Sequence, residues 1–393
     1  MRKLSDKMSL FSDSIIRGMT FFANKFNAIN LSQGFPDFDP PIEILNRLEQ
    51  VAHENYNQYP ISYGSENIRN ALAKKQKMFT GLDVDPETEL TITCGGTEAM
   101  VATILSIVNN GDKVAMFTPI YENYKTACIF AGAEQVYIPL RPSNKYSFDP
   151  NELEDAFKKG LKAIIVCNPS NPSGRVFTFD EMKFIADLAK KYDVYVITDE
   201  VYEHMVYEPN KMVYMATLPG MRERTIVCNS MSKTYSITGW RIGFAMAPKE
   251  ITDAIKKVSN FLVISAAAPL QEAITVGLNF KKEYYSDLLE KYTYKRNLVC
   301  NGLENINIEY FKPEGTYFIL MNLKELVKSS GLTNDFEFAK MVCEKYGLAF
   351  VPASSFFVDN YKTNGLFRMH FAKNDDVLNK ALERMETMKK KLI

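Results

Sequence analysis

The sequence lacks several features that would place it in other classes of protein. Its six cysteines include no C-x-x-C pair, which argues against a zinc cage or a redox dithiol, and we predict no metal site. Lys and Arg number 47 and Asp and Glu number 47, so the chain has no net charge that would favour nucleic acid as a partner. The longest apolar stretches, such as Phe261 to Leu270, are about half the length of a membrane span.

The cellular location is also indicated by what is missing. The N-terminus has no apolar core ahead of a small-residue cleavage site, as a secretory signal would have. Unpaired cysteines such as Cys94, Cys167 and Cys228 end apolar runs, where a free thiol behaves as a small buried hydrophobe. We therefore expect a cytoplasmic protein with no membrane or nucleic-acid partner.

The length and composition favour a folded protein with two lobes. Apolar residues make up 46% of the chain and charged residues 24%, which is ordinary for a globular protein. A chain of 393 residues is too long for one ordinary core.

Short β-branched runs alternate with segments of helical period between about residues 90 and 257. The runs are Leu90–Thr93, Lys113–Phe117, Gln135–Leu140, Ala163–Cys167, Val194–Thr198, Thr225–Cys228 and Ile242–Ala247, and plausible helices between them include Thr97–Asn109, Pro150–Lys159 and Phe179–Tyr192. Several runs are apolar on both faces, as strands are when helices cover both sides of a sheet. The pattern predicts an α/β fold with a large, doubly wound, mainly parallel sheet.

The pattern changes after about Asn279. A long charged helix, Lys281–Leu303, is followed by mixed strands and helices that indicate a smaller α+β domain. We predict an N-terminal segment at 1–45 that packs on the small domain, a large domain at 46–280 and a small domain at 281–393.

In open α/β sheets, ligands bind outside the carboxyl ends of the strands, so the residues after each predicted strand are candidates for a site. Gly95, Gly96 and Thr97 follow the first strand and open a helix, where backbone N–H groups can bind a phosphate. A tight turn explains the same glycines. Tyr121 follows the second strand, and its ring could either stack on a flat heterocycle or fill the edge of the core.

Three later strand ends carry polar groups. Asn171 lies in the stiff loop NPSNPSG, which could also be a purely structural turn. Asp199 ends an apolar strand with Tyr202 three residues on, and a carboxylate there is costly without a positive partner, although it could instead cap a helix. Glu200 and Glu203 fit structural roles better.

The last of these segments is rich in hydroxyl groups. Lys233 lies in S-M-S-K-T, after Ser230 and eight residues before Arg241, which suggests amine chemistry beside an anion site. A lone surface lysine is the simpler explanation of Lys233 taken by itself. Phosphate donors, a ring, a carboxylate, a phenol and a lysine at one edge of one sheet together favour a functional site.

These motifs, in this order, resemble class I/II (fold-type I) aminotransferases that depend on pyridoxal phosphate (PLP). The resemblance covers nearly the whole chain, and it rests on NLSQGFPDF (Asn30–Phe38), NPSNPSG, ITDEVYEH (Ile197–His204), S-x-S-K-T (Ser230–Thr234), TGWRIG (Thr238–Gly243) and FRMHFA (Phe367–Ala372). The GFPDF and KTYSITGWR segments look most like the branch of methionine, glutamine and kynurenine aminotransferases.

The resemblance implies a role for each candidate. Lys233 matches the Schiff-base lysine that also moves the substrate proton, Asp199 the partner of the pyridine nitrogen, and Tyr202 and Asn171 the donors to the ring hydroxyl. For the phosphate, the matching residues are Gly96, Thr97, Ser230, Arg241 and, from a neighbouring subunit, Tyr59, which implies a homodimer with shared active sites; Tyr121 matches the stacking ring.

Arg368 matches the arginine that binds the substrate α-carboxylate, although a surface ion pair would also explain an arginine there. Asn171 and the backbone of Gly34 are expected to share that carboxylate. Predicted pocket walls are Ile16, Phe35, Tyr63, Tyr121 and the partner's segment near residue 264. That segment, NFLVISAAAP, holds no basic residue, so we expect apolar or aromatic amino donors rather than dicarboxylates.

Three other functions remain open from the sequence. A PLP-dependent β-lyase acting on cysteine conjugates would release pyruvate and ammonia without an oxo-acid acceptor. A non-catalytic PLP-binding regulator would need a DNA-binding lobe, for which the N-terminus is too short. A nucleotide-binding α/β enzyme would need a G-x-G-x-x-G motif after a strand, and none is present.

Overall fold

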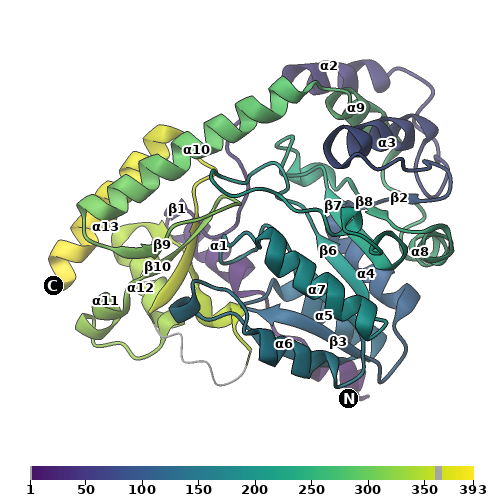
Figure 1. The fold of residues 1–393 in the computed structure, drawn as a ribbon. Helices are drawn as coiled ribbons and strands as arrows, with labels where there is room; N and C mark the ends of the chain where they lie inside the picture. The colour runs from purple at the N-terminus through teal and green to yellow at the C-terminus, as the bar shows by residue number, and fades with distance from the viewer. Residues whose placement is uncertain (1, 359–364) are drawn as a thin grey trace.

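A computed structural model describes residues 2–358 and 365–393 of the protein (Figure 1). A seven-stranded sheet lies at the centre of its larger part. In spatial order the strands are β2 (Leu90–Thr93), β8 (Gly243–Met246), β7 (Thr225–Ser230), β6 (Tyr195–Asp199), β5 (Leu161–Cys167), β3 (Lys113–Thr118) and β4 (Glu134–Pro139). All neighbours are parallel except β8, which is antiparallel to β2 and β7. The predicted mainly parallel sheet is confirmed, and the ends of the predicted strands shift by at most two residues.

Helices cover both faces of this sheet. One face is covered by α6 (Pro150–Phe157) and α7 (Phe179–Lys191), and the other by α4 (Gly95–Ile107), α5 (Glu122–Ala131) and α8 (Lys249–Leu262). Successive residues of a strand point to opposite faces, so Ile164 is buried in the first cluster and Ile165 in the second. This arrangement explains why the central strands are continuously apolar.

The start of α7 shows how the sequence sets the end of a helix. Thr178 Oγ1 accepts from Glu181 N at 3.2 Å, and Glu181 Oε2 accepts from Thr178 N at 2.8 Å. This capping box supplies partners for amide groups that have none within the helix. It also orients the Glu181 carboxylate back toward the loop that precedes α7.

The smaller part contains an antiparallel four-stranded sheet. Its order is β12 (Val351–Pro352), β13 (Leu366–His370), β10 (Phe318–Asn322) and β9 (Glu309–Phe311), and its helices include α11 (Lys324–Ser329), α12 (Asp335–Tyr346) and α13 (Asp375–Leu392). Arg368 of β13 lies opposite Leu320 of β10 and Val351 of β12. The predicted α+β character of this region is therefore confirmed.

One long helix, α10 (Lys282–Asn305), connects the two parts (Figure 1). It runs from the neighbourhood of α2 (Ile42–Val51) and α9 (Ala268–Leu278) to the smaller part, where Val299 joins the core. Near its start the Tyr285 hydroxyl lies 2.8 Å from the Tyr235 hydroxyl of the larger part. Neither α10 nor any other helix in the described ranges is long and apolar enough to cross a membrane.

The N-terminal segment contacts both parts. Helix α1 (Ile15–Lys25) packs against α12, and β1 (Ile29–Asn30) pairs in parallel with β11 (Leu348–Ala349). The residues before α1 contact α5 instead, where the Phe11 and Phe130 ring centroids lie 5.4 Å apart. The predicted boundaries after residues 45 and 280 stay predictions.

A buried ion pair joins α3 (Glu66–Thr80) to the loop after β6. Lys75 Nζ lies 2.8 Å from Glu203 Oε1, and each side chain is 3% exposed. Glu203 also accepts from Asn229 at 3.0 Å and from Tyr214 at 3.1 Å. Burial alone would raise the pKa of Glu203, but the charge of Lys75 and the neighbouring His204 hold it well below its usual range.

Replacing Lys75 tests this pair. Lys75→Met leaves a buried carboxylate without its cation, which should cost about 3 kcal/mol of unfolding free energy in urea. Lys77→Met is the matched control on the same helix, because its partner Asp83 is exposed; we expect a change below about 0.5 kcal/mol. Equal effects of the two variants would contradict the structural role of Lys75.

Candidate active site

An anion-binding cradle lies at the start of α4. Gly95 has φ +78°, and a Cβ built there would lie 2.4 Å from Nη2 of Arg241. A Cβ at Gly243 would lie 2.5 Å from the carbonyl carbon of Gly95. Only glycine allows these approaches, which bring a guanidinium against a helix N-terminus. Arg241 itself has φ 54°, an uncommon conformation for its residue type.

Hydroxyl groups surround this cradle. Ser230, at the end of β7, is buried, and its Cβ lies 3.6 Å from a Cβ built on Gly96. Ser230 Oγ donates to Ser232 Oγ at 2.7 Å. Asn123 Nδ2 donates to Thr97 Oγ1 at 3.1 Å and to the Tyr121 hydroxyl at 3.0 Å, so one amide connects the helix start to the predicted stacking ring.

Asp199 is held by a tyrosine that the sequence analysis missed. The Tyr124 hydroxyl donates to Asp199 Oδ2 at 2.6 Å, and Val201 N donates to Oδ1 at 3.2 Å. Burial raises the pKa of Asp199, and the Tyr124 hydrogen bond opposes that rise. Tyr124 also packs edge-on against Tyr121, with centroids 5.7 Å apart. Its place one turn after Tyr121 was visible in the sequence, but the direction of its hydroxyl was not.

Lys233 faces the loop that carries Gly34. Its Nζ donates to the Gly34 carbonyl at 3.0 Å, and the same oxygen accepts from the Tyr317 hydroxyl at 2.8 Å. A Cβ at Gly34 would lie 2.6 Å from the ring of Phe318. A glycine is therefore required for this loop to press on β10. Tyr202 is buried edge-on against the same two rings, at 5.2 and 5.8 Å, and burial raises its pKa well above 10.

Arg368 is a buried cation with neutral hydrogen-bond partners. It is 1% exposed, and its Nη1 and Nη2 donate to Asn171 Oδ1 at 2.7 Å and to the Ser32 carbonyl at 2.9 Å. Its guanidinium lies 4.1 Å from the Phe318 ring centroid and 4.6 Å from that of Phe356. Burial lowers the pKa of Arg368 to about 10, so it stays charged at neutral pH.

Among the described residues, the unpaired charge and the unpartnered N–H group of Arg368 favour an anionic ligand at this place. None of the ion pairs within the described ranges includes Arg368, and its Nε has no hydrogen-bond partner there. A buried charge needs a partner or coordinating groups to offset its desolvation. A carboxylate bound by two parallel N–H groups would supply one.

The remaining predicted residues divide into two groups. The Phe35 ring lies 6.5 Å from that of His370, which follows Arg368 by two residues in β13, and Ile16 is buried in the apolar cluster that also contains Phe356. Tyr63 instead packs between Arg69, 4.7 Å away, and Lys256, 4.0 Å away. Tyr59 is 83% exposed. Within one chain the structure does not bring Tyr59 and Tyr63 to this group.

One known protein family matches most of this chain. The family described as aminotransferase class I and II matches residues 27–385. The chain belongs to this family.

Individual aminotransferases are similar over nearly their whole length. The probable N-succinyldiaminopimelate aminotransferase of Mycobacterium tuberculosis is 33% identical, with 96% of each chain covered. The methionine aminotransferase of Escherichia coli is 32% identical over 97% of each chain. Their solved structures superimpose with TM-scores of 0.93 and 0.91, covering 98% of this chain and 100% of theirs. The kynurenine–oxoglutarate transaminase 3 of Bos taurus is 33% identical, with 91% of this chain and 84% of that protein covered.

Aminotransferases of this fold use PLP, and the residues of this chain fit that cofactor. The cradle of Gly95, Gly96 and Arg241 suits a phosphate, and Asp199 offers a partly buried carboxylate to a ring nitrogen. Lys233 supplies a primary amine that is bonded to one neutral carbonyl. Together these groups match the phosphate, the ring nitrogen and the aldehyde of a phosphorylated pyridine aldehyde.

A further buried acid follows Asp199. Glu200 is 2% exposed and accepts from Thr198 Oγ1 at 2.9 Å. Burial, and then the negative charge of Glu203, raise the pKa of Glu200 from 4.5 to about 8. Glu200 is therefore protonated in the folded enzyme at neutral pH.

This shift predicts a pH dependence of stability. An acid whose pKa is raised on folding stabilises the fold fully below its unfolded value of 4.5, and that stability is lost as the pH rises through about 8. The melting temperature of the wild type should therefore fall more steeply between about pH 5 and pH 8 than that of Glu200→Gln. Parallel curves in thermal melts across this range would show that Glu200 does not titrate there.

Proposed function

We propose that this aminotransferase moves the amino group of an apolar or aromatic L-amino acid (methionine, glutamine, phenylalanine, tyrosine or kynurenine) to a 2-oxo acid by a ping-pong mechanism. The observation that carries the proposal is the buried Arg368 guanidinium, whose hydrogen-bond partners among the described residues are neutral and which lies close to the rings of Phe318 and Phe356. It offers a charge for an α-carboxylate in surroundings that favour an apolar side chain.

The assignment of the cofactor contacts is part of this proposal. Arg241, Ser230, Gly96 and Thr97 would hold the phosphate, and Tyr121 would stack on the ring. Asp199 would face the ring nitrogen, while Tyr202 and Asn171 would bond the ring hydroxyl. When bound, PLP supplies an aldehyde that takes the amino group and a ring that accepts electron density from the α-carbon.

The proposed chemistry of this chain is a proton transfer by Lys233. Arg368 and Asn171 orient the substrate by its α-carboxylate, with the Gly34 loop beside them. Lys233 would hold the aldehyde of PLP through its amine, and its Nζ would take the α-proton of the substrate and give it back within the site. The 2-oxo acid leaves, and a second oxo acid accepts the amino group by the reverse steps, which gives ping-pong kinetics.

A homodimer with shared active sites completes this proposal. Tyr59 is 83% exposed, and Phe261, near the end of α8, and Ile264, just after α8, are 89% and 48% exposed. Exposed aromatic and apolar side chains of this kind support a protein interface. In the proposed dimer, Tyr59 reaches the phosphate of the neighbouring site. We also propose that the enzyme is cytoplasmic.

The substrate class can be tested by single half-reactions. Each candidate amino acid is added to the holoenzyme without an oxo acid, and the visible band of the bound cofactor is followed. We expect conversion by methionine and aromatic donors and little by aspartate. Kynurenine and N-succinyldiaminopimelate belong in the panel because relatives are named for them.

Two variants control this panel. Lys233→Ala should show no conversion. Arg368→Gln should lose about 100-fold in kcat/KM, or about 3 kcal/mol, because the carboxylate loses its cation. Preference for aspartate would contradict the substrate class, and pyruvate and ammonia from cysteine conjugates without an acceptor would favour the β-lyase.

The Tyr124 hydrogen bond gives a prediction about cofactor affinity. Tyr124→Phe removes a donor to Asp199, so the pKa of Asp199 should rise further and its charge beside the ring nitrogen should be weaker. We expect PLP to bind the apoenzyme about tenfold more weakly, from the loss of about 1.5 kcal/mol. Tyr192→Phe is the control, since Tyr192 bonds Glu154 on another face of the sheet. Unchanged PLP affinity in Tyr124→Phe would contradict the role of this bond.

A further inference from the structure

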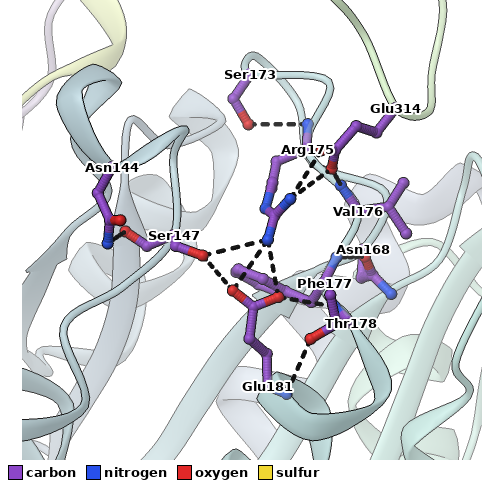
Figure 2. A network of polar contacts seen from close by, with 10 residues as sticks. All are labelled: Asn144, Ser147, Asn168, Ser173, Arg175, Val176, Phe177, Thr178, Glu181 and Glu314. Atoms are coloured by element: carbon purple, nitrogen blue, oxygen red, sulfur yellow. Dashed lines mark hydrogen bonds and ion pairs between the residues drawn. The ribbon is translucent and has the colours of Figure 1, made fainter. Parts of the chain in front are cut away.

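The loop between β5 and α7 carries an arginine that the proposed chemistry does not use. Figure 2 shows the Arg175 guanidinium between two carboxylates. Its Nη1 lies 2.8 and 2.9 Å from the two oxygens of Glu314, and its Nη2 lies 3.1 and 3.0 Å from those of Glu181. The Arg175 side chain is only 12% exposed. Both ends of the guanidinium are therefore engaged, and neither pair is a loose surface contact.

Further donors hold the two carboxylates. Glu314 Oε2 accepts from Val176 N at 3.0 Å, and Glu181 accepts from Thr178 N and from the Ser147 hydroxyl. Although burial opposes ionisation, the Ser147 hydroxyl, Thr178 N–H and Arg175 lower the pKa of Glu181. Glu181 therefore stays charged in this network.

The network joins the two parts of the protein. Glu314 lies in the turn between β9 and β10 of the smaller part, and Glu181 lies in α7 of the larger part. The backbone docks at the same place, where Glu314 N and Gly315 N both donate to the Gly174 carbonyl at 2.9 Å. A Cβ at Gly315 would lie 2.7 Å from Cβ of Pro169, so the turn and the loop are in direct contact.

The same loop carries Asn171. Ser170 N donates to the Arg175 carbonyl at 2.9 Å, and Gly174 N donates to the Ser170 carbonyl at 2.9 Å, which closes the loop on itself. Asn171 lies inside this closed stretch, and its Oδ1 accepts from Arg368 of the smaller part at 2.7 Å. The loop therefore contacts the smaller part twice, through Arg175 with Glu314 and through Asn171 with Arg368.

We propose that Arg175 is a positioning residue for the α-carboxylate site. By binding Glu314 and Glu181 at once, it holds the loop against the smaller part and keeps the Asn171 amide in register with Arg368. The proposal rests on the proposed binding of the α-carboxylate by Asn171 and Arg368. Its consequence is specific: the loss of Arg175 weakens the binding of amino acids through their carboxylate and leaves the side-chain pocket and the proton transfer intact.

Pairs of substrates that differ only in the carboxylate test this proposal. The half-reaction of the holoenzyme is measured with methionine and 3-(methylthio)propylamine, and with phenylalanine and phenethylamine. For Arg175→Gln we expect KM for the amino acids to rise about tenfold with kcat changed less than about twofold, because a small displacement of an orienting group is enough to weaken binding. The kinetics of the two amines should stay as in the wild type.

Matched variants separate positioning from general destabilisation. Arg47 of α2 makes another two-pronged ion pair, with Glu54 at 2.6 and 2.8 Å. Arg47→Gln breaks this pair and should leave the kinetics of both substrate classes unchanged. Glu314→Gln should act in the same direction as Arg175→Gln, and the double variant should be no worse than Arg175→Gln alone. If Arg175→Gln does not fold, Arg175→Lys keeps the charge and should show a smaller rise in KM for the amino acids only.

The outcomes are distinct. Equal losses for amino acids and amines in Arg175→Gln, or no change in either, would overturn the proposal. If Arg368→Gln still prefers amino acids over amines as the wild type does, the proposed carboxylate role of Arg368 is wrong, and the role of Arg175 is overturned with it. Loss of that preference in Arg368→Gln, together with wild-type preference in Arg175→Gln, would reject the role of Arg175 alone.

Discussion

The buried guanidinium of Arg368 is the constraint on which the site depends. A charge that is 1% exposed needs hydrogen-bond partners, and two of them come from far apart in the chain: the Asn171 amide and the Ser32 carbonyl. The β13 strand, the loop before α7 and the segment after α1 must therefore meet at one point. Because all three are fixed there, the proposed carboxylate site is already assembled in the protein without a ligand.

Parallel strands determine the other half of the site. β3, β5, β6 and β7 end at the same edge of the sheet, so the residues that follow them come together whatever their separation along the chain. This is why so much could be predicted from the sequence. Apolar runs located the strands, and the polar residues directly after them, such as Asp199 and Lys233, could be assigned to one edge before any contact was known.

The contacts that could not be predicted from the sequence also have physical explanations. The bond from Tyr124 to Asp199 depends on the direction of a side chain on a helix, and the bond from Arg368 to Ser32 uses a backbone carbonyl that looks the same at every position. Arg175 and Glu314 are 139 residues apart, and a single sequence gives no sign of such pairing. The surroundings of Tyr63 were unexpected because its ring is held by Arg69 and Lys256, two ordinary charged residues.

The pairing of β1 with β11 has a consequence for biosynthesis. The seven-stranded sheet contains its last strand once Met246 has been made, but Ile29 and Asn30 pair with residues 348 and 349, near the end of translation. During synthesis, Ile29 and Asn30 therefore cannot form their native pairing until residues 348 and 349 of the smaller part have emerged from the ribosome. During that interval the backbone groups of β1 and the side of α1 that carries Met19 and Ala23 lack the partners that the smaller part supplies.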